Sequence, residues 1–323
     1  MQSSNKLIQQ ITPTSDRKTE DILSTVSQEK FPNNDPLPVS FSGRRFAAYI
    51  ETLIGSFISP TSQYHQSPIL LQTIHHLVDL LTNACNPDGT LNSGNFASPP
   101  DTAFVVPPMG SALRALKHHA PKQTKTITHI EQFLKRIGEP LITGGIHTPN
   151  HRWVVCSALS YLYHFFNDPR YLSRIDQWLA EGIDIDPDGH VSERSTATYA
   201  HVTTDALIRI STLLNRPELL EPVRKCLSAM IYFFRLDGTI ETTASRRQDQ
   251  HQNPTGNRWY LDYRFMAIHD KNGLFTAQVQ ALEQTSVHLT PTTLIRLLEE
   301  PIFTQNTPEP KPLPNTYHIF HKH

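Results

Sequence analysis

Three polar side chains fall at matching positions of a repeating pattern and are suited to acting on an anionic ligand. Asn150 and His151 follow Pro149 at the start of an apolar helical stretch, where free N–H groups and the helix dipole favour a carboxylate. Tyr199 occurs about fifty residues later, at the predicted start of the next hairpin. A tyrosine close to Arg194 is suited to proton transfer at neutral pH. Taken singly, these residues are better explained as a helix cap and as packed rings.

Arginine side chains are frequent in the same loops. Arginine captures carboxylate or sulfate through two parallel hydrogen bonds, although exposed arginines are also ordinary surface residues. The predicted catalytic residues are Asn150, His151 and Tyr199. The predicted ligand-binding residues are Arg152, Trp153, Glu193, Arg194, Arg246, Arg247 and Asp101.

Paired carboxylates offer a second kind of chemistry. Asp101, Asp188, Glu193 and Asp249 lie in polar loops and could supply the acid and base of a glycoside hydrolase. Asp188, however, belongs to an Asp-Gly turn, which explains it structurally. A third reading is a non-catalytic toroid that only binds carbohydrate.

The elements that must position these residues are all predicted to be helices. Phe46, Ile50, Leu53 and Phe57 mark one face of a helix that begins near Arg44. Similar patterns occur at 69–85, 103–119, 126–138, 151–166, 170–182, 196–214, 217–234, 256–270, 273–286 and 291–299. Residues 1–40 lack such a pattern and are predicted to form a polar N-terminal arm.

A turn recurs after every second helix. It reads NPDGTL at 86–91, DPDGHV at 186–191 and LDGTI at 236–240, with a looser relative at 143–147. The spacing is close to fifty residues or its double, which is typical of stacked helical hairpins. The sequence therefore predicts an all-α fold, an (α/α) toroid over residues 41–305 with its long loops at one end. Whether the toroid is complete stays open.

Composition excludes several classes of partner. With 29 Lys and Arg against 30 Asp and Glu, no strong global field would attract nucleic acid or a membrane. Cys85, Cys156 and Cys226 lie far apart without a C-x-x-C motif, so neither a disulfide framework nor a zinc site is expected. No apolar leader segment is recognisable, which predicts a cytoplasmic protein as written, or an exported one if the N-terminus has been trimmed.

The stretch GGIHTPNHRWVVCSAL, followed by DGHVSERSTATY, resembles the catalytic toroid of heparinase II/III-like and alginate-lyase-like polysaccharide lyases. The resemblance is strongest over residues 140–250. It implies β-elimination on a uronate-containing, in some members sulfated, polysaccharide, without a cofactor. Asn150 and His151 would neutralise the substrate carboxylate, and Tyr199 would act as the acid. The expected partner is an anionic polysaccharide.

The resemblance also implies a C-terminal β-sandwich that supplies a further histidine. Residues 306–323 would form only a linker and the start of such a domain. The lyase is therefore expected to be impaired as it stands, or to complete its site with a partner.

Overall fold

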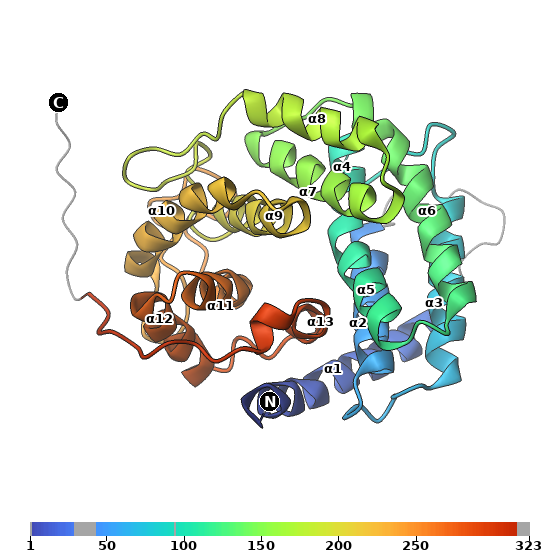
Figure 1. Cartoon of the computed structure of the whole chain (residues 1–323), viewed down its shortest axis with the longest axis horizontal. Coiled ribbons are helices and arrows are strands. Elements are labelled where there is room, and N and C mark those ends of the chain that lie inside the picture. The colour runs from blue at the N-terminus through green and yellow to red at the C-terminus, as the bar shows by residue number, and fades with distance from the viewer. Residues whose placement is uncertain (1, 29–42, 94, 315–323) are drawn as a thin grey trace. The chain divides into compact units, whose positions relative to one another are not determined.

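The computed structural model describes residues 2–28, 43–93 and 95–314, with side chains from residue 6 onward. Within these ranges all regular elements are helices (Figure 1), and β-structure is limited to isolated bridges. The α-helices are α1 (Gln2–Gln28), α2 (Gly43–Ile58), α3 (Pro68–Asn83), α4 (Pro99–Ala103), α5 (Val106–His119), α6 (Thr124–Thr143), α7 (Pro149–Phe166), α8 (Pro169–Ala180), α9 (Tyr199–Leu214), α10 (Leu220–Met230), α11 (Trp259–His269), α12 (Gly273–Gln284) and α13 (Pro291–Glu299). Short 3-10 helices are η1 (Pro217–Leu219), η2 (Ile231–Phe233), η3 (Gly256–Arg258) and η4 (Pro301–Thr304).

The helices predicted from apolar periodicity are present, with two refinements that proline explains. The helix predicted over 103–119 starts at Val106 as α5, because Pro107 and Pro108 fit only a first helical turn. The one predicted over 217–234 is η1, α10 and η2, with Pro217 at the start of η1. At the ends of two helices Asn167 and Asn215 adopt left-handed backbone conformations, and each is followed two residues later by proline.

The prediction of a polar arm over residues 1–40 missed α1. Leu7, Ile11 and Ile22 are buried on one side of this helix, which packs against α2 and α13. The apolar pattern is thin because buried hydroxyls fill the rest of that side, as with Ser15 and Thr19, which both bond to Ser56. Residues 29–42 lie outside the described ranges.

The chain divides into two compact units, and we describe each by itself. Unit 1 comprises Met1–His147, Val154–Gln177 and Leu289–Pro301, and unit 2 comprises Thr148–Trp153, Trp178–His288 and Ile302–His323. In unit 1, α2 packs against α3, α5 and α13. In unit 2, α11 packs against α9, α10 and α12. Residues 306–314 are neither helix nor strand. The start of a strand predicted over 313–323 lies outside the described residues from 315 onward.

The recurrent turn is confirmed at three of its four predicted places. Its two ends pair across an isolated bridge between Cys85 and Leu91, between Ile185 and Val191, and between Phe234 and Ile240. The glycines within them have φ of 90°, 91° and 78°, which is the left-handed region that glycine enters without steric cost. The looser relative at 143–147 is different, since Gly144 ends α6 with φ of −64°.

Candidate active site

The N-terminus of α7 binds a carboxylate, as the sequence suggests, but the carboxylate belongs to the protein. The backbone N–H of Asn150 donates to one oxygen of Glu193 and its side-chain amide to the other, both at 2.9 Å. The second amide N–H of Asn150 donates to Thr148 at 3.0 Å. Asn150 is fully buried and Glu193 nearly so. Both amide hydrogens of Asn150 are therefore used inside unit 2.

Glu193 also connects α7 to the tyrosine predicted to transfer a proton. It forms an ion pair with Arg247, whose guanidinium carbon lies 4.3 Å from the ring centroid of Tyr199. The Tyr199 hydroxyl donates to Gln248 at 3.0 Å. Nη2 of Arg247 has no hydrogen-bond partner in the described part of the chain, and the side chain is 23% exposed. Four predicted residues, Asn150, Glu193, Tyr199 and Arg247, thus form one contiguous group.

Two loops of unit 2 are joined so that this group is held in place. Ser195, in the loop before α9, accepts a hydrogen bond from the backbone N–H of Tyr199 and donates a buried one to Asp249. The N–H of Thr196 donates to Ser245, and that of Arg246 to the carbonyl of Arg194. Because these bonds tie residues 194–199 to residues 245–249, Arg247 and Tyr199 come from mutually fixed segments.

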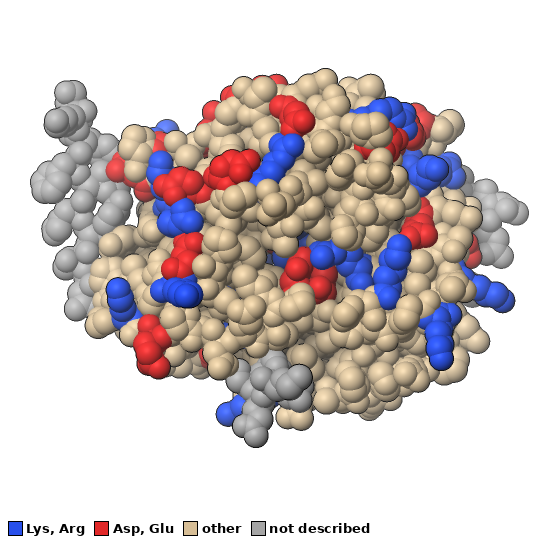
Figure 2. Space-filling model, in the orientation of Figure 1, with Lys and Arg blue, Asp and Glu red and all other residues tan. Residues whose placement is uncertain are grey.

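The other predicted arginines divide into buried and exposed ones. Arg152 is 7% exposed at its side chain, forms ion pairs with Glu181 and Asp184 at 2.9 Å, and stacks on Trp153. This arginine and the buried tryptophan therefore stabilise the start of α7 rather than offering a ligand surface. Arg194 is about half exposed and 3.5 Å from Asp186, and Arg246 is exposed. On the face shown in Figure 2, basic side chains lie beside acidic ones instead of forming one basic surface.

Asp101 belongs to α4 in unit 1, where its carboxylate bonds to α2 and to the segment just before α4. It accepts hydrogen bonds from Arg44 at 2.5 Å, Asn95 at 2.8 Å and Ser98 at 2.7 Å. Ser98 is in turn 3.2 Å from Nε2 of His147. These bonds use both oxygens of Asp101 and support a role in forming the wall of the loop.

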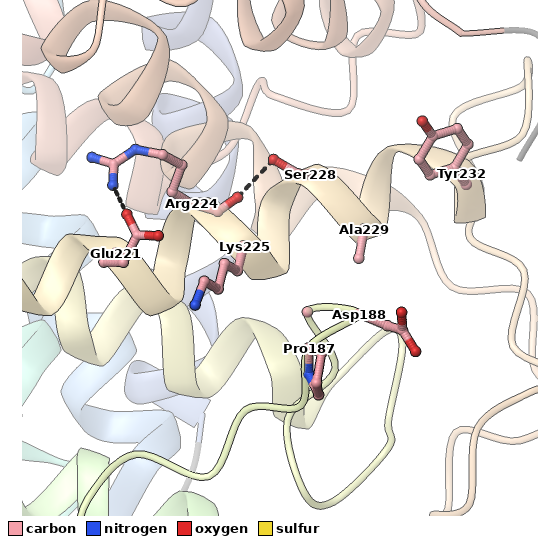
Figure 3. Close-up of a pocket in the computed structure, with 9 residues that line it drawn as sticks. Pro187, Asp188, Glu221, Arg224, Lys225, Ser228, Ala229 and Tyr232 are labelled. Carbon is pink, nitrogen blue, oxygen red and sulfur yellow. Dashed lines mark hydrogen bonds and ion pairs between the residues drawn. The ribbon is translucent and has the colours of Figure 1, made fainter. Parts of the chain in front are cut away.

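The other two carboxylates considered for a glycoside hydrolase, Asp249 and Asp188, differ in their exposure to solvent. Asp249 is buried and accepts bonds from Ser195 and the N–H of Ala197. Asp188 lines an open pocket of about 450 Å³ between α10 and the turn at 187–189, shown in Figure 3. Arg224 on that pocket is already bonded to Glu221 and Asp270.

One close pair was missed by the sequence analysis. Nδ1 of His201, in the first turn of α9, lies 3.1 Å from the buried carboxylate of Asp262 on α11. Asp262 stands within the apolar run Trp259–Phe265, so periodicity alone treats its position as core. No sequence motif links Asp262 to His201, which is 61 residues away in the chain.

The described residues contain neither a metal-binding cluster nor a membrane-spanning helix. Among them there is no group of three or more His, Cys, Asp or Glu side chains arranged to hold a metal ion. None of the helices described is long and apolar enough to cross a membrane.

Comparison with known proteins defines the fold. No protein-family model matches the sequence, and no curated protein matches it. Among solved structures, a sugar epimerase from a ruminal bacterium aligns over 77% of this chain and 76% of its own, with a TM-score of 0.52 and 12% identity. Cellobiose 2-epimerase from Bacillus thermoamylovorans aligns over 84% and 87%, with a TM-score of 0.52 and 13% identity.

A polysaccharide lyase also aligns, over 94% of this chain and 91% of its own at 15% identity. Its TM-score of 0.48 is too low to support a conclusion about fold or function. At such identities the likeness shows the fold alone. The predicted class, an all-α fold of the (α/α) toroid kind, is confirmed. The narrower resemblance to heparinase II/III-like lyases stays a prediction.

Proposed function

We propose that unit 2 binds a uronate residue of an anionic polysaccharide and cleaves the adjacent glycosidic bond by β-elimination. The observation that carries the proposal is the stacking of Arg247 on Tyr199, with Arg247 fixed by the buried Glu193. The phenol of Tyr199, a proton donor, thus lies beside the guanidinium of Arg247, whose Nη2 makes no hydrogen bond in the described part of the chain. The structures that share the fold include two described as sugar epimerases, which also act on carbohydrate.

The chemistry requires one cation and one acid near each other. Elimination removes the proton on C5 of the uronate and expels the oxygen on C4, and the C5 proton becomes acidic only when the neighbouring carboxylate is neutralised. Tyr199 would donate its phenolic proton to O4 as the C4–O4 bond breaks. The guanidinium of Arg247 over the ring would stabilise the phenolate left behind.

Neutralising the carboxylate is assigned to Arg247 rather than to the Asn150 amide. Both amide hydrogens of Asn150 already donate to Glu193 and Thr148, whereas Nη2 of Arg247 is available in the described part of the chain. Asn150 would then act by orienting Glu193, and through it Arg247. His151, half-buried in the next position, stays a candidate second contact to the carboxylate.

The exposed arginines of the same loops suit a polymer. Arg194 and Arg246 are joined through a backbone hydrogen bond and both side chains reach solvent. Neighbouring uronates or sulfates of a chain would find bidentate partners there. These side chains would act on binding more than on the chemical step.

The test is the appearance of ultraviolet absorbance from the conjugated C4–C5 double bond when the full chain is offered a panel of uronate polysaccharides. Wild-type protein should produce it, and Tyr199→Phe should lower the rate by about 10²- to 10⁴-fold, the usual contribution of an acid–base group. Tyr232→Phe, an exposed tyrosine of the same unit, serves as the matched control and should keep its rate.

Other outcomes separate the alternatives. New reducing ends without the absorbance would favour a hydrolase that uses carboxylates such as Glu193 and Asp249. Saturable binding of the polymer with neither signal would favour a binding toroid. Either result would overturn the lyase proposal.

A further inference from the structure

The three recurrent turns differ in what their central aspartate does. In the first turn, Asp88 accepts hydrogen bonds from the N–H of Thr90 at 2.9 Å and from its hydroxyl at 2.7 Å. In the third turn, Asp237 accepts the same two bonds from Thr239, at 2.9 and 2.6 Å. Each of these carboxylates completes its own turn, which is the usual structural use of an aspartate at such a position.

The aspartate of the second turn is not used in this way. The residue two positions after Asp188 is His190, which has no hydroxyl. Its N–H donates to Asp186 at 2.9 Å, and the N–H of Asp188 donates to Asp186 at 3.1 Å. Asp186 therefore supplies the bonds that complete this turn. The exposed carboxylate of Asp188 makes no hydrogen bond or ion pair with the described residues.

The basic residue beneath the turn differs in the same sense. Gly89 of the first turn lies against Arg136 of α6, and Gly189 of the second turn lies against Lys225 of α10. The guanidinium of Arg136 donates to two carbonyls at the start of the first turn, at 3.5 Å each. The exposed ammonium of Lys225, in contrast, makes no hydrogen bond or ion pair with the described residues.

The two unpaired charges line one pocket of unit 2. This pocket, between α10 and the second turn, is open and has a volume of about 450 Å³, which is within the usual range for ligand sites. Figure 3 shows Lys225 and Ala229 on the side of α10 that faces Pro187 and Asp188. In unit 1 the residue four positions after the basic one is Pro140, so the smaller alanine leaves more room beside the second turn.

The side chains around the pocket indicate the chemistry of its ligand. Glu221 and Arg224 also line it, but they are bonded to each other. Asp188 and Lys225 therefore remain as an acceptor and a donor. A group with neighbouring hydroxyls can donate to the carboxylate and accept from the ammonium, whereas a simple anion or cation would leave one of the two unmatched. Pro187 adds apolar surface that suits C–H groups.

We infer that this pocket is a second carbohydrate-binding site and that it takes an uncharged sugar residue. Two hydroxyls of the residue bridge Asp188 and Lys225, and its C–H face lies on Pro187. Because the pocket is open, the residue can belong to a longer chain. The site does not depend on the proposed elimination, since none of its lining residues belongs to the group around Glu193 and Arg247.

The test is the binding of neutral oligosaccharides to the full chain, followed by saturation-transfer difference NMR. The probes are linear hexasaccharides of glucose, mannose, galactose and xylose, which lack the carboxylate that Arg247 is proposed to bind. At least one probe should bind wild-type protein. Asp188→Ala and Lys225→Met should each weaken its affinity by about 10- to 100-fold, the usual effect of losing a hydrogen bond to a charged group. Both side chains are exposed and unbonded, so both variants should fold.

The first turn supplies matched controls. Asp88→Ala and Arg136→Met make the same changes where both side chains already bond within unit 1, and they should keep the wild-type affinity. A double variant, Asp186→Asn with His190→Thr, gives the second turn the NPDGT sequence of the first. It should return the carboxylate of Asp188 to the turn and weaken binding by about 10-fold.

Three results would overturn the inference. The first is that no neutral probe binds wild-type protein. The second is an unchanged affinity in both Asp188→Ala and Lys225→Met, which would place the sugar elsewhere. The third is binding of free amino acids, tested in parallel, that depends on Asp188 while no saccharide binds, because the ligand would then be a zwitterion. Elimination of uronate polymers is measured separately, and neither its presence nor its absence alters these outcomes.

Discussion

The group around Asp101 in unit 1 and the group around Glu193 in unit 2 share one arrangement of side chains. We propose that the first orders the local structure and that the second also takes part in catalysis. In unit 1, Asp101 accepts bonds from Arg44 and Asn95, and Arg44 lies 3.8 Å from the ring centroid of Phe104. In unit 2, Glu193 accepts bonds from Arg247 and Asn150, and Arg247 lies 4.3 Å from the ring centroid of Tyr199. Each is a buried carboxylate, an amide, an arginine and an aromatic ring.

The difference between them is one hydroxyl group and the exposure of the arginine. Phe104 has no proton to give, whereas Tyr199 does. Arg44 is 42% exposed at its side chain and Arg247 is 23% exposed, so the second cation is the more strongly desolvated. The shared carboxylate–arginine–aromatic arrangement can by itself order a loop. Proton transfer also requires the hydroxyl of Tyr199. A buried carboxylate beside an arginine is by itself weak evidence of an active site.

Among changes that would break this comparison, the largest effect is expected from replacing the two carboxylates. Glu193→Gln keeps the shape but removes the charge that holds Arg247, so kcat/KM should fall by about 10- to 100-fold, in keeping with 1.5–3 kcal/mol for a hydrogen bond to a charged group. Asp101→Asn should instead lower the melting temperature with a smaller change in kcat/KM. Turnover and thermal unfolding of both variants check this. An equal loss of kcat/KM in Asp101→Asn would place Asp101 at the ligand, as the sequence reading allowed.

Replacing the two arginines by lysine should separate binding from loop order. Arg247→Lys retains the charge but loses the planar fork, so KM should rise several-fold as carboxylate capture weakens. Arg44→Lys should leave KM unchanged and cost little stability, because the arginine of that ion pair is 42% exposed and lysine keeps its charge. Steady-state kinetics with a uronate polymer gives the answer. A rise in KM for Arg44→Lys would show that unit 1 also contacts the polymer.

Much of the fold was predictable because its signals are local. Apolar periodicity located α2, α3 and α5 to α13, and the Asp-Gly turns revealed the hairpin repeat. The N-terminal helix was missed because its buried side contains Ser15 and Thr19, whose partner Ser56 is distant in sequence. Burial of hydroxyls depends on what the helix meets, and periodicity cannot report that.

The sequence indicated which residues belong to the candidate group, but not which of them form hydrogen bonds and ion pairs with one another. The sequence analysis named Asn150, Glu193, Tyr199 and Arg247 among its candidates, and these residues do meet in unit 2. Nothing in the sequence indicated that Glu193 would occupy the anion position at α7, or that Arg152 would be consumed by Glu181 and Asp184. Such pairings are decided by loops packing in space, which spacing along the chain does not encode.

Glycine variants test whether the repeated turns of the two units are equivalent. Gly89 and Gly189 have φ near +90°, and a Cβ would lie 2.5 Å from the Arg136 carbonyl oxygen and 2.4 Å from that of Lys225. Alanine at either should cost more than about 1 kcal/mol, because the backbone is strained and the neighbour must shift. Gly145→Ala, with nothing within 4 Å, is the control and should be neutral. Urea unfolding measures all three, and tolerance of only one variant would contradict equivalence.

The smallest effect concerns the aspartates of the same turns. Hydrogen bonds from the hydroxyl and N–H of Thr90 lower the pKa of Asp88 from its ordinary 3.8, and those of Thr239 lower the pKa of Asp237. A carboxyl whose pKa is depressed by folding stabilises the protein above its unfolded-state value, and this stability is lost as the pH falls through the lower folded-state value. Asp88→Asn and Asp237→Asn should therefore each lower the melting temperature slightly at neutral pH, with the difference from wild type vanishing in acid. Because both aspartates are exposed, solvent keeps the effect small. Thermal unfolding followed as the pH is lowered measures it, and a difference that persists undiminished in acid would mean that turn geometry, rather than carboxylate charge, is what the variants disturb.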